Sequence, residues 1–128
     1  MPLFNREERK AKQAALQAEV DRLQALSPDE LAMEVLPALG SEELKRRLTG
    51  VRVQDVVKAT LAGESSWTIN TGVLLLPVRE ALQRLEHANL VLQMASGSDE
   101  GTRWRITTEG EQRLANGDVA QALGVKPA

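Results

Sequence analysis

The chain is 128 residues long and 42% hydrophobic, but only Phe4, Trp67 and Trp104 are aromatic. This length suits one domain with an accessory element, whose interior must be filled by Leu, Val and Ala. The absence of cysteine excludes disulfides, thiolate nucleophiles and thiolate metal sites.

Positive and negative charges are nearly balanced along the chain. Residues 1–50 contain 8 Lys and Arg against 9 Asp and Glu, residues 51–128 contain the same numbers, and the formal net charge is −2. Binding to a phosphate backbone depends on clustered cations. The overall charge therefore gives no support to nucleic-acid binding, although a local basic face would still permit it.

The apolar segments of the chain are short. None approaches the length of a membrane-spanning helix, and residues 5–12 are charged where a secretory signal would be apolar. We therefore expect a soluble cytoplasmic protein without a membrane partner.

The first predicted element is a helix from Asn5 to Leu26, rich in Ala, Glu, Gln, Lys and Arg. Asn5 and Glu8 have the spacing of a capping box. Its apolar stripe is thin and consists of Leu16, Val20 and Leu23. Two interpretations follow: a partly solvated helix lying on the domain, or a helix that forms a homodimer.

Ser27-Pro-Asp-Glu30 is a well-specified helix start, and this second helix is predicted to run to about Leu36 and to end at Pro37 and Gly40. A short helix opening at Ser41 follows. Its last turn carries the densest positive run in the chain, Lys45, Arg46 and Arg47. Cations there complement the helix dipole, and their functional alternative is contact with phosphate.

The central part of the chain predicts a helix and a strand. Val53 to Leu61 has a buried apolar face, and Gly63 closes it. Ser65 to Asn70 is short, β-prone and bounded by turn residues, so we expect a small strand that pairs with the hairpin described below. Thr71 to Leu76 leaves room for a single helical turn.

The segment from Pro77 to Leu114 predicts helix, hairpin and helix in succession. Val78, Leu82 and Leu85 form the stripe of an amphipathic helix. Leu90 to Met94 and Arg103 to Thr107 are predicted strands around the turn-rich residues 96–101. Thr108-Glu-Gly-Glu111 has capping-box spacing and opens the closing helix, which is expected to stop at Asn116-Gly117. Asp118 to Leu123 predicts a further turn or two ended by Gly124.

Two runs in this segment carry a resemblance to a known family. They are Val78-x-x-Ala81-Leu82-x-x-Leu85-Glu86-x-x-Asn89-Leu90-Val91 and Arg103-Trp104-x-Ile106-Thr107-x-x-Gly110-x-x-x-Leu114. The chain there resembles the recognition helix, wing and closing helix of winged-helix regulators of the PadR and MarR type. The resemblance covers about 40 residues and implies a fold more firmly than a function.

The resemblance implies that the helix after Pro77 is a recognition helix, and helical geometry then predicts its outward face. Turning 100° per residue with Val78, Leu82 and Leu85 inward places Leu76, Glu80, Gln83 and His87 at the centre of that face. The expected DNA contacts are Arg79 and Arg84 at its flanks, Gln83 at its centre, and Arg103 and Arg105 at the base of the wing. Lys45, Arg46 and Arg47 are possible phosphate contacts. Leu76 is the anchor if the face binds a protein instead.

Catalysis is not expected. The chain has one histidine, His87, and no Cys or Tyr, which removes most nucleophile–base pairs and metal sites. Adjacent acids such as Asp99 and Glu100 are solvated in a turn. We predict a non-enzyme with no cofactor and no metal.

These patterns predict an α+β, mainly α protein: a winged helix with a small antiparallel hairpin, a possible third strand and an N-terminal helical extension. Residues 1–26 are the extension, a possible dimerisation element, and residues 27–128 the winged-helix domain. The expected function is DNA binding by a small transcription-regulator-like homodimer. The alternative is a winged helix that binds a protein and not DNA.

Overall fold

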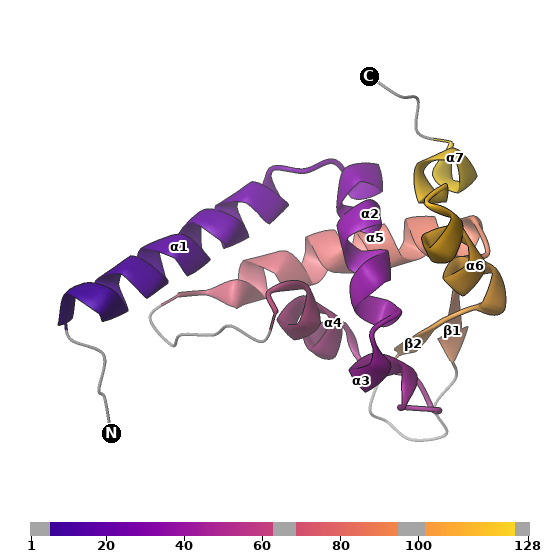
Figure 1. Ribbon diagram of the computed structural model, residues 1–128, viewed down its shortest axis with the longest axis horizontal. Helices are drawn as coiled ribbons and strands as arrows, with labels where there is room; N and C mark the ends of the chain where they lie inside the picture. The colour runs from indigo at the N-terminus through magenta and orange to yellow at the C-terminus, as the bar shows by residue number, and fades with distance from the viewer. Residues whose placement is uncertain (1–5, 63–68, 95–101, 125–128) are drawn as a thin grey trace.

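The computed structural model describes residues 6–62, 69–94 and 102–124 (Figure 1). The protein is α+β and mainly α, as predicted, and its antiparallel hairpin lies at one side of the helices. The elements in chain order are α1 (Arg6–Gln24), α2 (Pro28–Leu39), α3 (Glu42–Lys45), α4 (Val53–Thr60), the 3-10 helix η1 (Thr71–Leu74), α5 (Leu75–His87), β1 (Val91–Met94), β2 (Arg103–Ile106), α6 (Thr108–Asn116) and α7 (Val119–Leu123).

The core is built around the crossing of α2 and α5, which lie against each other at the centre of the molecule (Figure 1). The inward face of α5 consists of Val78, Ala81, Leu82 and Leu85, all buried, as the spacing predicted. On α2 the fully buried side chains include Leu31, Val35 and Leu36. Burying each such aliphatic side chain stabilises the fold by roughly 1.5–3 kcal/mol. The outward face of α5 is left free by this packing.

Helix α2 begins as predicted but ends later. The Ser27 hydroxyl accepts a hydrogen bond from the Glu30 amide at 3.2 Å, and the Ser27 amide donates to the Glu30 carboxylate at 3.1 Å. The prediction that the helix stops before Pro37 was wrong, because α2 continues through Pro37 to Leu39, whereas Gly40 ends the helix as predicted and is its C-cap. Leu39 is buried, so the apolar packing of this last turn offsets the hydrogen bond that proline cannot donate.

The hairpin pairs β1 with β2 in antiparallel register, Val91 opposite Ile106 and Met94 opposite Arg103. Trp104 is buried. Most of the third strand expected at residues 65–70 lies outside the described residues; of its described part, Asn70 caps η1. A residue from another part of the chain, Val51, pairs with β2. The Val51 and Trp104 backbones exchange two hydrogen bonds of 2.8 Å.

Thr107 joins the hairpin to the closing helix. Its hydroxyl donates to the Asn89 carbonyl at 2.7 Å and accepts from the Gly110 amide at 2.9 Å. Thr107 is therefore the N-cap of α6, and the prediction that Thr108 caps this helix was wrong by one residue. Asn89 ends the α5 segment in the left-handed region at φ 63°, a conformation in which asparagine is often found after a helix. Gly110 is required by a close approach, because a Cβ there would overlap the Leu90 carbonyl oxygen.

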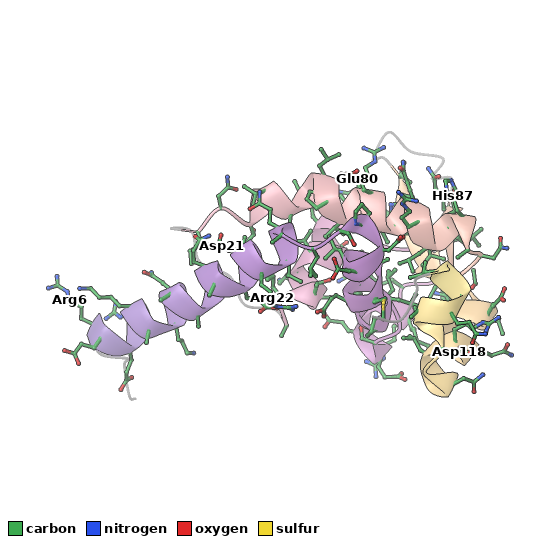
Figure 2. All side chains as sticks on the ribbon, turned by 90° about the horizontal axis from the view of Figure 1, so that it is seen from above. Arg6, Asp21, Arg22, Glu80, His87 and Asp118 are labelled. Carbon is green, nitrogen blue, oxygen red and sulfur yellow. The ribbon has the colours of Figure 1, made fainter. Side chains whose placement is uncertain are left out.

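Helix α1 extends away from the rest of the molecule. Its N-terminal half, residues 6–15, is exposed, and both views show this half pointing away from the other helices (Figures 1 and 2). The stripe of Leu16, Val20 and Leu23 is buried within the same chain, where α1 meets η1. The apolar residues that suggested a dimer helix are therefore already covered.

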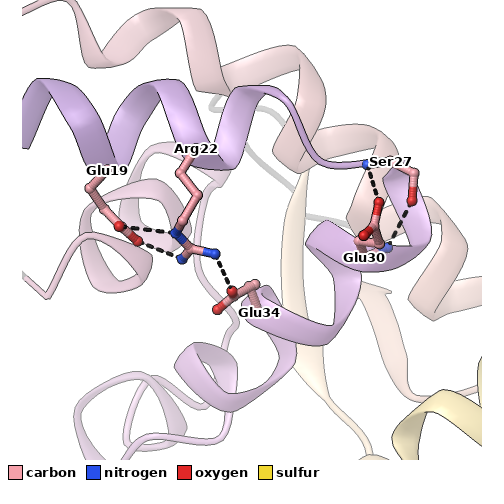
Figure 3. Close-up of polar contacts among 5 residues, drawn as sticks. All are labelled: Glu19, Arg22, Ser27, Glu30 and Glu34. Atoms are coloured by element: carbon pink, nitrogen blue, oxygen red, sulfur yellow. Dashed lines mark hydrogen bonds and ion pairs between the residues drawn. The ribbon is translucent and has the colours of Figure 1, made fainter. Parts of the chain in front are cut away.

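Arg22 ties α1 to α2 (Figure 3). Its guanidinium lies 2.6 Å from the Glu19 carboxylate and 2.7 Å from that of Glu34 on α2. The hydrogen bonds that Arg22 donates to Glu19 and then to Glu34 raise the pKa of Arg22, and the bonds to Glu19 lower the pKa of the Glu19 carboxyl. All three side chains are well exposed, so the ion pairs contribute little to stability compared with the buried stripe.

Several expected features fall outside the described residues. They are the Asn5 cap and the turn at 96–101 with Asp99 and Glu100. Among the described residues, the order α4, η1, α5 and hairpin is compatible with a winged helix. The single turn allowed at Thr71 to Leu76 forms as η1 and runs directly into α5.

Candidate nucleic-acid interface

The outward face of α5 is an exposed surface on a helix whose other face belongs to the core. Its exposed residues are Leu76, Arg79, Glu80, Gln83, Arg84 and His87. Figure 2 shows Glu80 and His87 on the side of α5 that is turned away from α2. Helix α5 has 13 residues and is therefore about 20 Å long. A helix of this length with one free side has the dimensions that the major groove of a duplex accepts.

Charges on this face are mixed. Arg84 lies 4.0 Å from the Asp29 carboxylate of α2, at the limit of an ion pair. Arg79 and Glu80 make no ion pair within the described part of the chain. The two arginines are thus balanced by Glu80 on the same helix and by Asp29 beside it. The face is open, but its summed charge is close to zero.

The structure gives Arg105 of β2 a role in holding the fold together. Its guanidinium donates to the carbonyl oxygens of Lys45 at 3.0 Å and Arg47 at 3.2 Å. It is half-buried and holds the segment after α3 against the hairpin. Arg103 lies two residues earlier, so it projects from the same face of the hairpin as Arg105. Both predicted wing contacts are thus engaged within their own chain, Arg105 with these two carbonyl oxygens and Arg103 with a partner of its own.

The run Lys45 to Arg47 is likewise engaged with neighbouring elements. Lys45 lies 3.6 Å from the Glu111 carboxylate of α6, and Arg47 lies 3.2 Å from the Asp55 carboxylate of α4. Arg46 is exposed and has no ion pair among the described residues. Exposed ion pairs are worth about 0–1 kcal/mol, so Lys45 and Arg47 remain available to a phosphate. Their partners lie on α4 and α6, and none lies on α5.

An apolar patch lies at the beginning of α5. Leu76 is 67% exposed and Val73 of the preceding η1 is 36% exposed. Val73 was missed from the sequence, because the apolar run Val73 to Leu76 gives no sign of which side chains turn outward. The only sequence feature that indicated exposed apolar side chains here was the length of the run, since four consecutive apolar residues cannot all lie on the buried face of one helix.

A groove of about 380 Å³ lies between the α2–α3 corner and α4, and sequence reasoning did not identify it. Its lining combines small side chains with charges of both signs, among them Ser41, Glu43, Arg47, Asp55 and Lys58. Side chains so far apart in sequence give no local signal of a shared surface. In the described ranges, no cluster of three His, Cys, Asp or Glu residues is placed to hold a metal ion.

Comparison with protein-family models, with curated proteins and with solved structures finds no match for this chain. No family is therefore shown, and any function must be argued from the surfaces described above. Among the described helices, none combines the length and apolarity needed to cross a membrane.

Proposed function

We propose that this chain is a small non-enzymatic winged-helix protein that binds duplex DNA through the outward face of α5. The observation that carries the proposal is the exposed face of a helix whose opposite face packs against α2 and α4. In a helix-turn-helix arrangement, the second helix enters the major groove and the first crosses the backbone. Here α4 precedes α5, and the hairpin follows it directly.

The proposed contacts divide by chemistry. Gln83 lies at the centre of the face and its amide suits an adenine edge, whereas Arg79 and Arg84 at the flanks suit phosphates. Arg103 is the proposed wing contact. Arg105 is proposed to act mainly by holding the segment of Lys45 to Arg47, with Arg46 as the cation of that segment most accessible to phosphate.

Salt dependence tests this proposal. The affinity of the intact chain for a short duplex should fall as salt rises, with a slope of roughly 0.9 per neutralised phosphate in a double-logarithmic plot. The double variant Arg79→Ala, Arg84→Ala should reduce that slope by about 2. Lys10→Ala is the control: it also removes a positive charge, but from the projecting half of α1, and it should leave the slope unchanged. Absence of binding to any duplex at low salt would reject the proposal.

A protein partner is the second candidate, and the exposed Leu76 and Val73 favour it. Aliphatic side chains exposed together at the start of a helix are suited to insertion into a partner's pocket. Leu76→Asp should then abolish partner capture while leaving the circular dichroism spectrum unchanged. Capture that survives this substitution would reject the candidate.

A homodimer remains part of the proposal. The buried stripe of α1 does not supply its interface, so the dimer would have to use exposed residues of that helix or another surface. Light scattering across micromolar concentrations measures the mass in solution: a dimer has twice the 14.0 kDa mass of the chain, and a mass of 14.0 kDa throughout would reject the homodimer.

A further inference from the structure

The centre of the α5 face holds the carboxylate of Glu80. Glu80 is exposed and makes no ion pair in the described part of the chain. Helix geometry puts it within about 40° of Leu76 and within about 60° of Gln83. Every part of α5 that packs against α2 and α4 turns the other way. Glu80 therefore enters any groove that α5 enters.

A carboxylate at that position is unfavourable beside a phosphate backbone unless it meets a donor. In the major groove only two base groups present N–H donors, the N4 amine of cytosine and the N6 amine of adenine. Guanine presents acceptors there, and thymine presents an acceptor and a methyl group. A base pair opposite Glu80 that lacks a correctly placed amine leaves the carboxylate desolvated and facing acceptors.

We propose that Glu80 is a specificity-determining residue that selects cytosine by accepting a hydrogen bond from its N4 amine. The inference rests on the proposed DNA binding by α5. Gln83 is the better reader of adenine, since its amide both donates and accepts and can pair with N6 and N7. Glu80, which can only accept, is left with the base whose major-groove edge is a donor alone.

The side chains next to Glu80 indicate which other bases the bound sequence contains. Glu80 and Gln83 are three residues apart, about 4.5 Å along the helix axis. Successive bases of one strand are about 3.4 Å apart. The cytosine and the adenine therefore lie within one or two base pairs of each other. Leu76, one turn before Glu80, suits the methyl group of a thymine.

The scarcity of cations gives the complex a distinctive binding profile. Few phosphates are neutralised, so non-specific binding is weak and its salt dependence shallow. Discrimination between bases then accounts for a larger share of the affinity than in a strongly basic protein. Loss of the Glu80 carboxylate should consequently relax the sequence preference and, by removing repulsion, strengthen binding to unrelated duplexes.

Selection from a pool of duplexes with a randomised centre tests the inference. The intact chain should enrich duplexes with a cytosine at one position, preferred by roughly tenfold over guanine or thymine. Glu80→Ala should abolish that preference while retaining the rest of the enriched sequence, and Glu80→Gln should admit adenine at the same position. Glu42→Gln, which removes an exposed carboxylate from α3, is the matched control and should keep the cytosine.

The outcomes separate the two proposals. Enrichment of a shared sequence without a cytosine preference, or a preference that survives Glu80→Ala, overturns the role of Glu80 and leaves DNA binding intact. Failure to retain any duplex at low salt overturns DNA binding and the role of Glu80 together. Circular dichroism of each variant confirms that it is folded, which an exposed position leads us to expect.

Discussion

The Thr107–Gly110 junction and the outward face of α5 both lie in the segment from Pro77 to Leu114, but their residues differ in how far they contribute to the fold. At the junction each distinctive residue has a partner: the Thr107 hydroxyl bonds two backbone groups, and Gly110 admits the Leu90 carbonyl oxygen. On the α5 face, Arg79 and Glu80 have no ion pair in the described chain. The motif residues that resemble winged-helix regulators therefore build the fold, and the residues between them are left to determine function.

Gly110→Ala should have the largest effect on stability. In an open helix this change would stabilise by roughly 1 kcal/mol through helix propensity. Here the added Cβ overlaps the Leu90 carbonyl oxygen and approaches Ile106 Cγ1 to 2.8 Å. We expect the free energy of unfolding in urea to fall by about 2 kcal/mol or more. Gln112→Ala, an exposed change on the same helix, is the control, and a stabilised Gly110→Ala variant would contradict the close approach.

Thr107→Ala should have the next largest effect. The variant loses the helix cap and leaves the Asn89 carbonyl without its donor. Loss of an N-cap costs about 1 kcal/mol, and loss of the second hydrogen bond adds to it. Thr107→Ser retains both hydrogen bonds and should unfold close to the native chain. Equal losses in Thr107→Ala and Thr107→Ser would show that the methyl group, and not the hydroxyl, matters.

Arg105→Ala should reduce stability by about 1 kcal/mol, because the carbonyl oxygens of Lys45 and Arg47 lose a half-buried donor. Arg46→Ala is the matched control in the same segment and should leave the unfolding midpoint unchanged. If Arg105→Ala is as stable as Arg46→Ala but weakens DNA binding more, then Arg105 is a direct contact and not a positioning residue.

The smallest effect is expected on the α5 face. Arg79→Ala and Gln83→Ala should each change the free energy of unfolding by no more than about 0.5 kcal/mol, as exposed substitutions usually do. Urea denaturation of both variants checks this expectation. A loss above about 1 kcal/mol in the free energy of unfolding would show that residues of the α5 face stabilise the fold, as those of the Thr107–Gly110 junction do.

The sequence predicted the fold well where one periodicity or one cap decides the outcome. The stripe of Val78, Leu82 and Leu85 and the Ser27 cap were found because each signal lies within a few residues. The end of α2 was predicted too early because the local preference of Pro37 for ending a helix is outweighed by the packing of Leu39, a tertiary effect.

Long-range pairing could not be predicted. Val51 lies between Gly50 and the start of α4, without the alternation that marks a strand, and it pairs with β2 only through an isolated bridge to Trp104. The hydrogen bonds from Arg105 to Lys45 and Arg47 could not be predicted either, because about 60 residues separate the partners. The candidate site was predicted as a set of positions on α5, but which of its cations are occupied by the fold required the structure.

Mapping the duplex onto the protein tests the central claim most directly. Amide NMR spectra of the intact chain, recorded as a short duplex is added, should show shifts concentrated on residues 75–87 and on β2, with α1 and α7 unchanged. Shifts confined to the segment around Lys45 to Arg47, or spread over α1, would contradict α5 as the binding element. An unchanged spectrum at low salt would contradict DNA binding altogether.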